Sequence, residues 1–157
     1  EMSGEEEWDV IIAHFLGVDH VGHRFGPVHD TMKSKLEQLD AALADVIAAC
    51  EAHGAVAVPC HPGRKRVGMA AHLEEFGVPE GVRIVEVING GSRDDEDAVS
   101  QRMADKLGYN GTGGSDAHIV SHIGRCATEF EQPIHNEQEL VAALKNGAFK
   151  AIKLPVQ

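Results

Sequence analysis

Hydrophobic and polar residues alternate along the chain in a pattern that predicts strands separated by helices. Residues 9–16 form a continuous apolar run, which is typical of a strand buried on both faces. From Asp30 to His53 apolar residues recur every three or four positions, which predicts a long helix ended by Gly54. Further strands are expected at Ala55–Cys60, Val82–Ile88, Tyr109–Gly113, Arg125–Phe130 and Ala148–Leu154, and further helices at Val67–Phe76, Asp94–Leu107 and Glu137–Lys145. This repetition predicts an α/β fold with a mostly parallel sheet and right-handed crossovers.

The first long helix keeps one apolar stripe over its whole length. The stripe consists of Met32, Leu36, Leu39, Leu43, Val46, Ile47 and Cys50. A stripe that stays in phase predicts one unbroken helix on one sheet, with the strand at residues 9–16 added beside Ala55–Cys60. We therefore expect Leu39 and Leu43 to be buried and Leu43→Ala to cost about 2–5 kcal/mol.

Metal-capable side chains follow several of the predicted strands. His61 directly follows one strand, Glu86 lies within the next, and Asp116 and His118 come after a glycine pair. In an extended segment residues i and i+2 point to the same face, so Asp116 and His118 can reach one ion. Because ligand sites of parallel sheets lie beyond the carboxyl ends of the strands, the pattern predicts a metal site formed by His61, Asp116 and His118.

The same residues have structural alternatives. Asp116 and His118 also suit a turn after glycines. A lone carboxylate is costly to bury, so Glu86 either pairs with Arg83 or Arg125 or lies near the metal.

Three further side chains are candidates for substrate binding. Arg64 and Arg125 can each hold phosphoryl oxygens through two hydrogen bonds. His122 follows the Asp116–His118 motif closely enough to approach a substrate. Arg64 alternatively belongs to a solvated basic cluster with Lys65 and Arg66.

Four motifs in succession resemble the C-terminal half of a PHP (polymerase and histidinol phosphatase) domain. They are His61-Pro62-Gly63-Arg64, Ile84-Val85-Glu86-Val87-Ile88-Asn89-Gly90, Gly114-Ser115-Asp116-Ala117-His118 and Ile123-Gly124-Arg125. The resemblance covers about residues 44–154 and implies a partial (β/α) barrel and a metal-dependent phosphoesterase. It supports His61, Asp116 and His118 as ligands of Zn, Mn or Fe. The family's opening His-x-His motif is not found upstream of His61, so a complete multinuclear centre is not expected.

A second resemblance lies in the first forty residues. The segment Asp19-His20-Val21-Gly22-His23-Arg24-Phe25-Gly26-Pro27 is similar to a motif of the alkaline-phosphatase superfamily, as found in glycosylphosphatidylinositol ethanolamine-phosphate transferases. The resemblance implies that Asp19 and His23 ligate zinc. The nucleophilic Thr or Ser and the Asp-His pair that this family also needs are not found in the sequence. We expect a single α/β domain in which residues 1–40 are alkaline-phosphatase-like and residues 41–157 are PHP-like, with a seam near Leu36–Asp45.

Composition and charge narrow the classes of partner. A net charge of −11 over 157 residues argues against binding to nucleic acid or an anionic membrane, but not against phosphate substrates. No apolar run approaches the roughly 20 residues of a membrane span, and the acidic start does not suit a signal peptide. We therefore expect a cytoplasmic protein. Because the sequence starts at Glu1 without Met, we also expect that it is processed, excised or cut from a longer chain. Open sheet edges make self-association an expectation as well.

Together these patterns predict a divalent-metal-dependent phosphoesterase of PHP type, acting by hydrolysis on a small phosphorylated substrate. A bound metal would lower the pKa of a water molecule to supply hydroxide. Mixed His and carboxylate ligands do not decide which metal is bound. Two alternatives stay open: a non-catalytic chimera or fragment with a remnant metal site, and a fragment of an alkaline-phosphatase-type phosphoethanolamine transferase.

Overall fold

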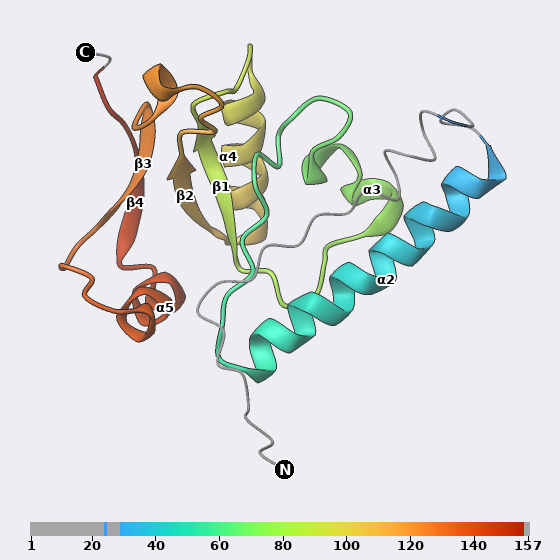
Figure 1. Cartoon of the computed structure of the whole chain (residues 1–157), viewed down its shortest axis with the longest axis horizontal. Helices are drawn as coiled ribbons and strands as arrows, with labels where there is room; N and C mark the ends of the chain where they lie inside the picture. The colour runs from blue at the N-terminus through green and yellow to red at the C-terminus, as the bar shows by residue number, and fades with distance from the viewer. Residues whose placement is uncertain (1–23, 25–28, 156–157) are drawn as a thin grey trace. The chain divides into compact units, whose positions relative to one another are not determined.

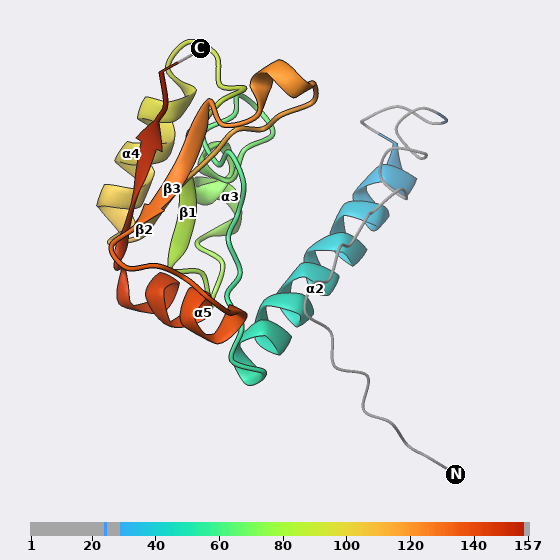
Figure 2. The same ribbon diagram turned by 60° about the vertical axis from the view of Figure 1, so that its left-hand side comes forward.

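The computed structural model describes Arg24 and residues 29–155, and its contacts divide the chain into two units, residues 1–46 and 47–157. The strand expected at residues 9–16 and the candidate zinc ligands Asp19 and His23 lie outside the described residues. Figures 1 and 2 show the elements in two views. No helix of the described part is long and apolar enough to cross a membrane.

Helix α2 runs from Asp30–Ala52 without a break, which confirms the predicted continuous helix across the expected seam. Gly54 ends it with φ of 76°, a backbone conformation that glycine adopts without strain. Ile47 packs against the core of the second unit, but Leu43 is 44% exposed. The expected burial of Leu43 is therefore wrong. Helical periodicity shows which residues share a face, but not whether another element covers that face.

The core of the second unit is a strand–helix–strand unit. Strand β1 (Ile84–Asn89) pairs in parallel with strand β2 (Asn110–Gly114), and helix α4 (Glu96–Leu107) connects them and packs on β1 (Figure 1). The buried cluster consists of Val82, Val85, Val87, Met103 and Ala104. The predicted helix and both strands are confirmed here. A register shift between Glu86 and Ile88 marks a bulge close to the end of β1.

The pairing of the next two strands is antiparallel, which differs from the predicted parallel arrangement. Strand β3 (Cys126–Phe130) pairs antiparallel with strand β4 (Phe149–Lys153), with helix α5 (Glu137–Asn146) between them in sequence (Figure 2). Phe130 lies opposite Phe149 with ring centroids 5.9 Å apart, and Lys150 pairs with Glu129 at 2.7 Å. The expected parallel crossover is wrong at this pair, because β4 begins beside the end of β3 and these cross-strand pairs set the opposite register.

Helix α5 begins as predicted at the Asn136 cap. The Asn136 side chain accepts a hydrogen bond from the Glu139 N–H at 2.8 Å, and Glu139 accepts one in return from Asn136 Nδ2 at 3.0 Å. The first of these bonds satisfies the Glu139 N–H, one of the backbone donors that the first turn of a helix leaves free, and the second holds the Asn136 side chain in place. The local sequence alone therefore fixes the start of α5.

Strands β2 and β3 approach closely through a glycine. The Gly113 N–H donates to Thr128 Oγ1 and that hydroxyl donates back to the Gly113 carbonyl, both at 3.0 Å. A Cβ at Gly113 would collide with the Ala127 carbonyl oxygen. The glycine-rich sequence of β2 therefore reflects this close approach to a neighbouring backbone.

Two predicted elements are less regular than expected. Residues 55–60 are not a strand, although the Pro59 carbonyl accepts the Glu86 N–H at 3.0 Å. The helix expected at residues 67–76 is divided into a 3₁₀ turn, η1 (Met69–Ala71), and a short helix, α3 (Leu73–Phe76). Gly68 precedes the 3₁₀ turn and packs closely on the Pro62 carbonyl group, which leaves no space for a side chain at this position. The described fold is thus mixed α/β with one parallel and one antiparallel strand pair.

The core predicts a contrast in stability. Met103→Ala is expected to lower the free energy of unfolding by about 2–5 kcal/mol, because Met103 is 5% exposed in the core. Leu43→Ala should cost less than about 1 kcal/mol, since Leu43 already faces solvent. Urea unfolding followed by circular dichroism measures both. An equal or larger loss for Leu43→Ala would contradict the described exposure.

Candidate functional site

The Glu86 carboxylate organises the end of β1. Its Oε2 atom accepts the His61 N–H at 2.6 Å and the Asn89 side-chain amide at 2.8 Å. Glu86 is 9% exposed, and a Cβ on Gly114 would collide with its Oε1 atom. Glu86 pairs with neither of the two arginines proposed from the sequence. Because the carboxylate accepts two donors from separate segments, the cost of its burial is offset by hydrogen bonds.

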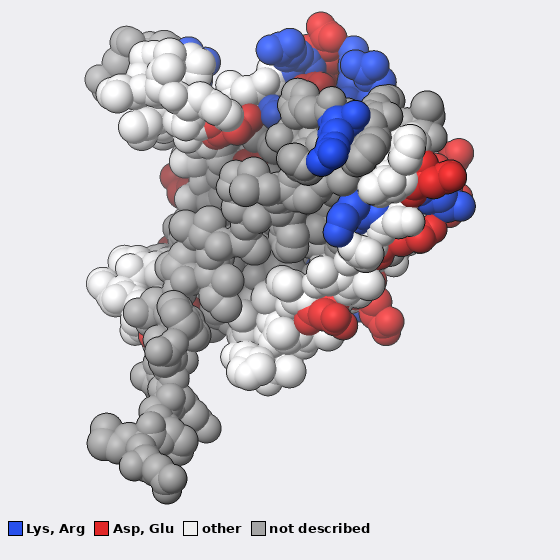
Figure 3. All heavy atoms as spheres, turned by 45° about the vertical axis from the view of Figure 1, so that its right-hand side comes forward, with Lys and Arg blue, Asp and Glu red and all other residues white. Residues whose placement is uncertain are grey.

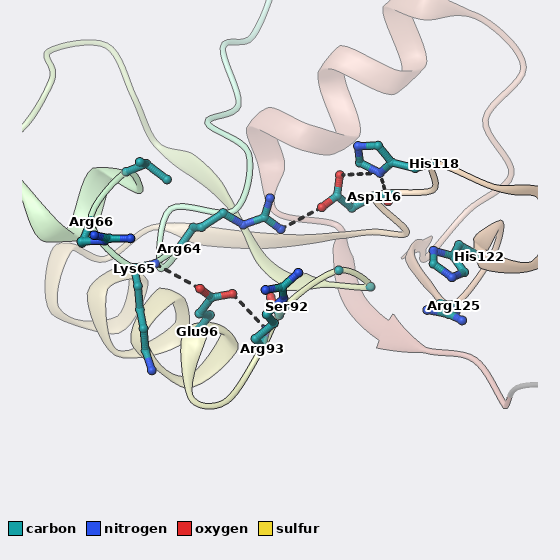
Figure 4. A pocket seen from close by; sticks show the side chains of 13 residues that line it. Arg64, Lys65, Arg66, Ser92, Arg93, Glu96, Asp116, His118, His122 and Arg125 are labelled. Carbon is teal, nitrogen blue, oxygen red and sulfur yellow. Dashed lines mark hydrogen bonds and ion pairs between the residues drawn. The ribbon is translucent and has the colours of Figure 1, made fainter. Parts of the chain in front are cut away.

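Asp116 is held in an ion pair. Arg64 Nη2 donates to Asp116 Oδ2 at 2.8 Å, with the two side chains 29% and 18% exposed (Figure 4). This hydrogen bond from Arg64 is the main cause that lowers the pKa of Asp116, against a smaller opposing effect of burial. The charges of Arg64, His61 and His118 lower this pKa further. Asp116 is therefore ionised across the neutral range.

The backbone conformation that brings Asp116 close to His118 differs from the predicted extended strand. Strand β2 ends at Gly114, and Asp116 has φ of 48°, so the two residues do not share the face of an extended strand. The turn nevertheless brings them together: His118 Nδ1 lies 2.9 Å from the Asp116 carbonyl oxygen and 3.8 Å from its Oδ1. The backbone at Asp116 therefore forms a turn, which was the structural alternative for this motif.

The described residues do not fit a metal ion as they stand. Asp116 is already bound by Arg64, and the side chain of His118 is 81% exposed. Within the described part of the chain, no three His, Cys, Asp or Glu side chains lie close enough to hold an ion. Metal ligation by His61, Asp116 and His118 stays a prediction.

Asp116 lies on the wall of a cavity of about 940 Å³ that we name the basic cavity. Its lining consists of Arg64, Lys65, Arg66, Val67, Gly90, Gly91, Ser92, Arg93, Glu96, Asp116, His118, His122 and Arg125. It contains five of the fourteen Lys and Arg residues of a chain whose net charge is −11. Figure 3 shows Lys and Arg side chains gathered on one part of the described surface, with acidic side chains among them. The local sign of charge is thus opposite to that of the whole protein.

Glu96, at the start of α4, ties two walls of the basic cavity together. Its carboxylate accepts the Lys65 N–H at 3.1 Å and the Arg93 N–H at 2.9 Å. These two backbone hydrogen bonds, from Arg93 first, lower the pKa of Glu96. The carboxylate therefore orders both loops that carry the cations.

All three predicted substrate-binding residues, Arg64, His122 and Arg125, line this cavity, whereas His61 and Glu86 do not. The structure adds residues that the sequence interpretation missed, notably Arg93 and Glu96. A signal existed for Arg93, because it follows the glycine pair at the carboxyl end of β1, where ligand sites of parallel strands lie.

Two family models match separate parts of the chain. A PHP-associated family matches residues 98–149, which include Asp116, His118, His122 and Arg125. The type I phosphodiesterase / nucleotide pyrophosphatase family matches residues 1–60. Both resemblances inferred from the motifs are confirmed, and the second extends beyond the expected seam. No solved structure was found to match.

Curated relatives match a short segment only. GPI ethanolamine phosphate transferase 3 of Schizosaccharomyces pombe is 54% identical over 43 residues, which are 27% of this chain and 5% of that protein. The catalytic subunit of the human transferase 3 is 56% identical over 41 residues, 26% of this chain and 4% of its own length. GPI ethanolamine phosphate transferase 2 of Aspergillus fumigatus is 43% identical over 47 residues, 30% of this chain and 6% of its own. The chain therefore spans about a twentieth of these proteins, and both of its resemblances are to families of phosphoester chemistry.

The Arg64–Asp116 pair predicts a pH-dependent contribution to stability. Asp116→Asn should lower the free energy of unfolding by about 1 kcal/mol at pH 7, because it removes a partly buried ion pair. A lowered pKa stabilises the folded state above the pKa of the unfolded carboxyl group, and this stabilisation is lost as pH falls towards the lower folded value. Urea unfolding should therefore show the difference between variant and wild type shrinking from pH 5 towards pH 3.

Asp45→Asn is the matched control, since Asp45 is exposed on α2. A difference for Asp116→Asn that stays constant with pH would contradict the role of the ion pair.

Proposed function

We propose that the basic cavity binds the phosphoryl group of a small phosphate ester, as part of a phosphoester hydrolase of PHP type. The observation that carries the proposal is the collection of five basic side chains on one cavity of an acidic protein. Arginine forks match the oxygens of a phosphate, and they stabilise charge that develops on those oxygens during transfer. The PHP-associated match at residues 98–149 supports the same chemistry.

Arg125 and His122 are the first candidates to contact the phosphoryl group. Arg125 Nε is buried and has no hydrogen-bond partner among the described residues, so no acceptor of the described part holds the guanidinium group through this atom. His122 lines the cavity beside it (Figure 4). Arg64 by contrast is engaged by Asp116.

Dependence on a divalent metal is a separate part of the proposal. The PHP resemblance makes Zn, Mn or Fe the expected ion, which would lower the pKa of a water molecule when present. In the described structure the Asp116 carboxylate is paired with Arg64, so this pair would have to open before Asp116 could bind an ion.

A second candidate function rests on the N-terminal segment. Its identity of 54% over 43 residues to a GPI ethanolamine phosphate transferase 3 favours a fragment of a phosphoethanolamine transferase. In this alternative Asp19 and His23 would ligate zinc, and the basic cavity would take no part. Asp19→Ala therefore distinguishes the two: phosphate binding by the protein should be unchanged if the basic cavity is the site, and lost if a zinc ion held by Asp19 and His23 is the site.

Phosphate binding by the basic cavity gives the first test. Isothermal titration with inorganic phosphate should show binding that Arg125→Gln weakens about tenfold, as expected for the loss of one charge-assisted hydrogen-bonding group. Arg102→Gln is the control, because Arg102 is exposed on α4 and outside the cavity. Equal losses in both variants, or no binding to the wild type, would contradict the proposal.

Metal binding gives the second test. Arg64→Gln should bind Mn²⁺ or Zn²⁺ more tightly than the wild type, by about tenfold, because it releases the Asp116 carboxylate for the ion. Titration calorimetry measures the change, with Arg66→Gln as the control. The gain should disappear when Asp116→Asn is added. An unchanged metal affinity in Arg64→Gln would show that the ion pair does not block a metal site.

A further inference from the structure

The basic cavity has two ends. Figure 4 shows Arg66 at one end and Arg125 with His122 at the other, with Ser92 and Arg93 between them. Its volume of about 940 Å³ lies near the upper limit for small-molecule sites, which run from about 300 to 1,000 Å³. A single phosphate group would therefore occupy only one part of it.

The cations of the cavity fall into two sets. Arg64 pairs with Asp116 at 2.8 Å, and Lys65 Nζ pairs with Asp94 at 2.8 Å. The side chains of Arg66, Arg93 and Arg125 have no hydrogen-bond or ion-pair acceptor within the described part of the chain. The three guanidinium groups that lack an acceptor thus lie at both ends and in the middle of the cavity.

The two acidic residues of the lining do not neutralise these three groups. The Asp116 carboxylate is engaged by Arg64, and the Glu96 carboxylate by the backbone N–H groups of Lys65 and Arg93. Among the described residues no carboxylate is paired with these three groups, so a bound anion can interact with each of them. A phosphate monoester carries a charge of about −1.5 to −2 near neutral pH, so two such groups suit three guanidinium groups and a neighbouring histidine.

We infer that the ligand of the basic cavity carries two separate anionic groups, one bound by Arg125 and His122 and the other by Arg66 and Arg93. This inference rests on the proposed function and names its substrate class: a compact bisphosphorylated molecule, with its reacting phosphoryl group at the Arg125 end. The glycine pair Gly90–Gly91 also lines the cavity, and its backbone packs closely on Ser115 and Asp116.

Titration calorimetry with fructose bisphosphate and fructose monophosphate tests the inference on the full chain. The bisphosphate should bind at least about tenfold more tightly than the monophosphate, because only it reaches both ends. Arg66→Gln should remove most of this advantage, so that it weakens binding of the bisphosphate by about tenfold more than binding of the monophosphate. Arg102→Gln, outside the cavity, should change neither affinity. Circular dichroism confirms that each variant is folded.

The outcomes separate this inference from the proposed function. If both sugars bind equally well, or if Arg66→Gln weakens both to the same extent, the ligand does not have two anionic groups bound at separate ends, and the proposed function stands. If neither sugar phosphate binds the folded wild type, the proposed function fails as well.

Discussion

The rest of the described site depends on the buried carboxylate of Glu86. By accepting the His61 N–H at 2.6 Å and the Asn89 amide at 2.8 Å, it joins the segment before the first basic loop to the end of β1. The absence of a side chain at Gly114 lets the end of β2 lie against the same carboxylate. An apolar side chain in place of Glu86 would leave the His61 N–H and the Asn89 side-chain amide without this acceptor, at the point where three segments meet.

From this junction the arrangement of charge follows. Asn89 Oδ1 accepts the Gly91 N–H at 2.8 Å, which shapes the glycine turn along the cavity, and Glu96 fixes the loops on either side of it. Five basic side chains line the cavity, against only the two carboxylates of Glu96 and Asp116. This is why a chain with a net charge of −11 can present a locally basic cavity.

The two family resemblances contribute differently to function. The PHP-associated match includes residues of the basic cavity, so the sequence similarity and the geometry concern the same part of the chain. The match at residues 1–60 contains no residue of the basic cavity, and the structure describes only Arg24 and residues 29–60 of it. The identity to a GPI ethanolamine phosphate transferase 3 extends over 43 residues, which are 27% of this chain. Both indicate phosphoester chemistry, but only the cavity provides described contacts from which binding can be argued.

The sequence by itself determined the elements whose formation is local. The spacing of apolar residues predicted α2, α4 and β1, and the Asn136 cap with Gly147 fixed α5, because helix starts and ends are set by hydrogen bonds among neighbours. The motifs also predicted substrate binding by Arg64, His122 and Arg125; all three line the cavity, and their binding role stays a prediction. Only the tertiary structure decided the features that depend on residues far apart in the sequence. The antiparallel β3–β4 register follows from cross-strand pairs, and the partner of Asp116 is an arginine 52 positions away. The exposure of Leu43 also depends on tertiary structure, since no local pattern shows which face of a helix another segment will cover. The same holds for Glu96, because the sequence does not show which backbone N–H groups its carboxylate will bind.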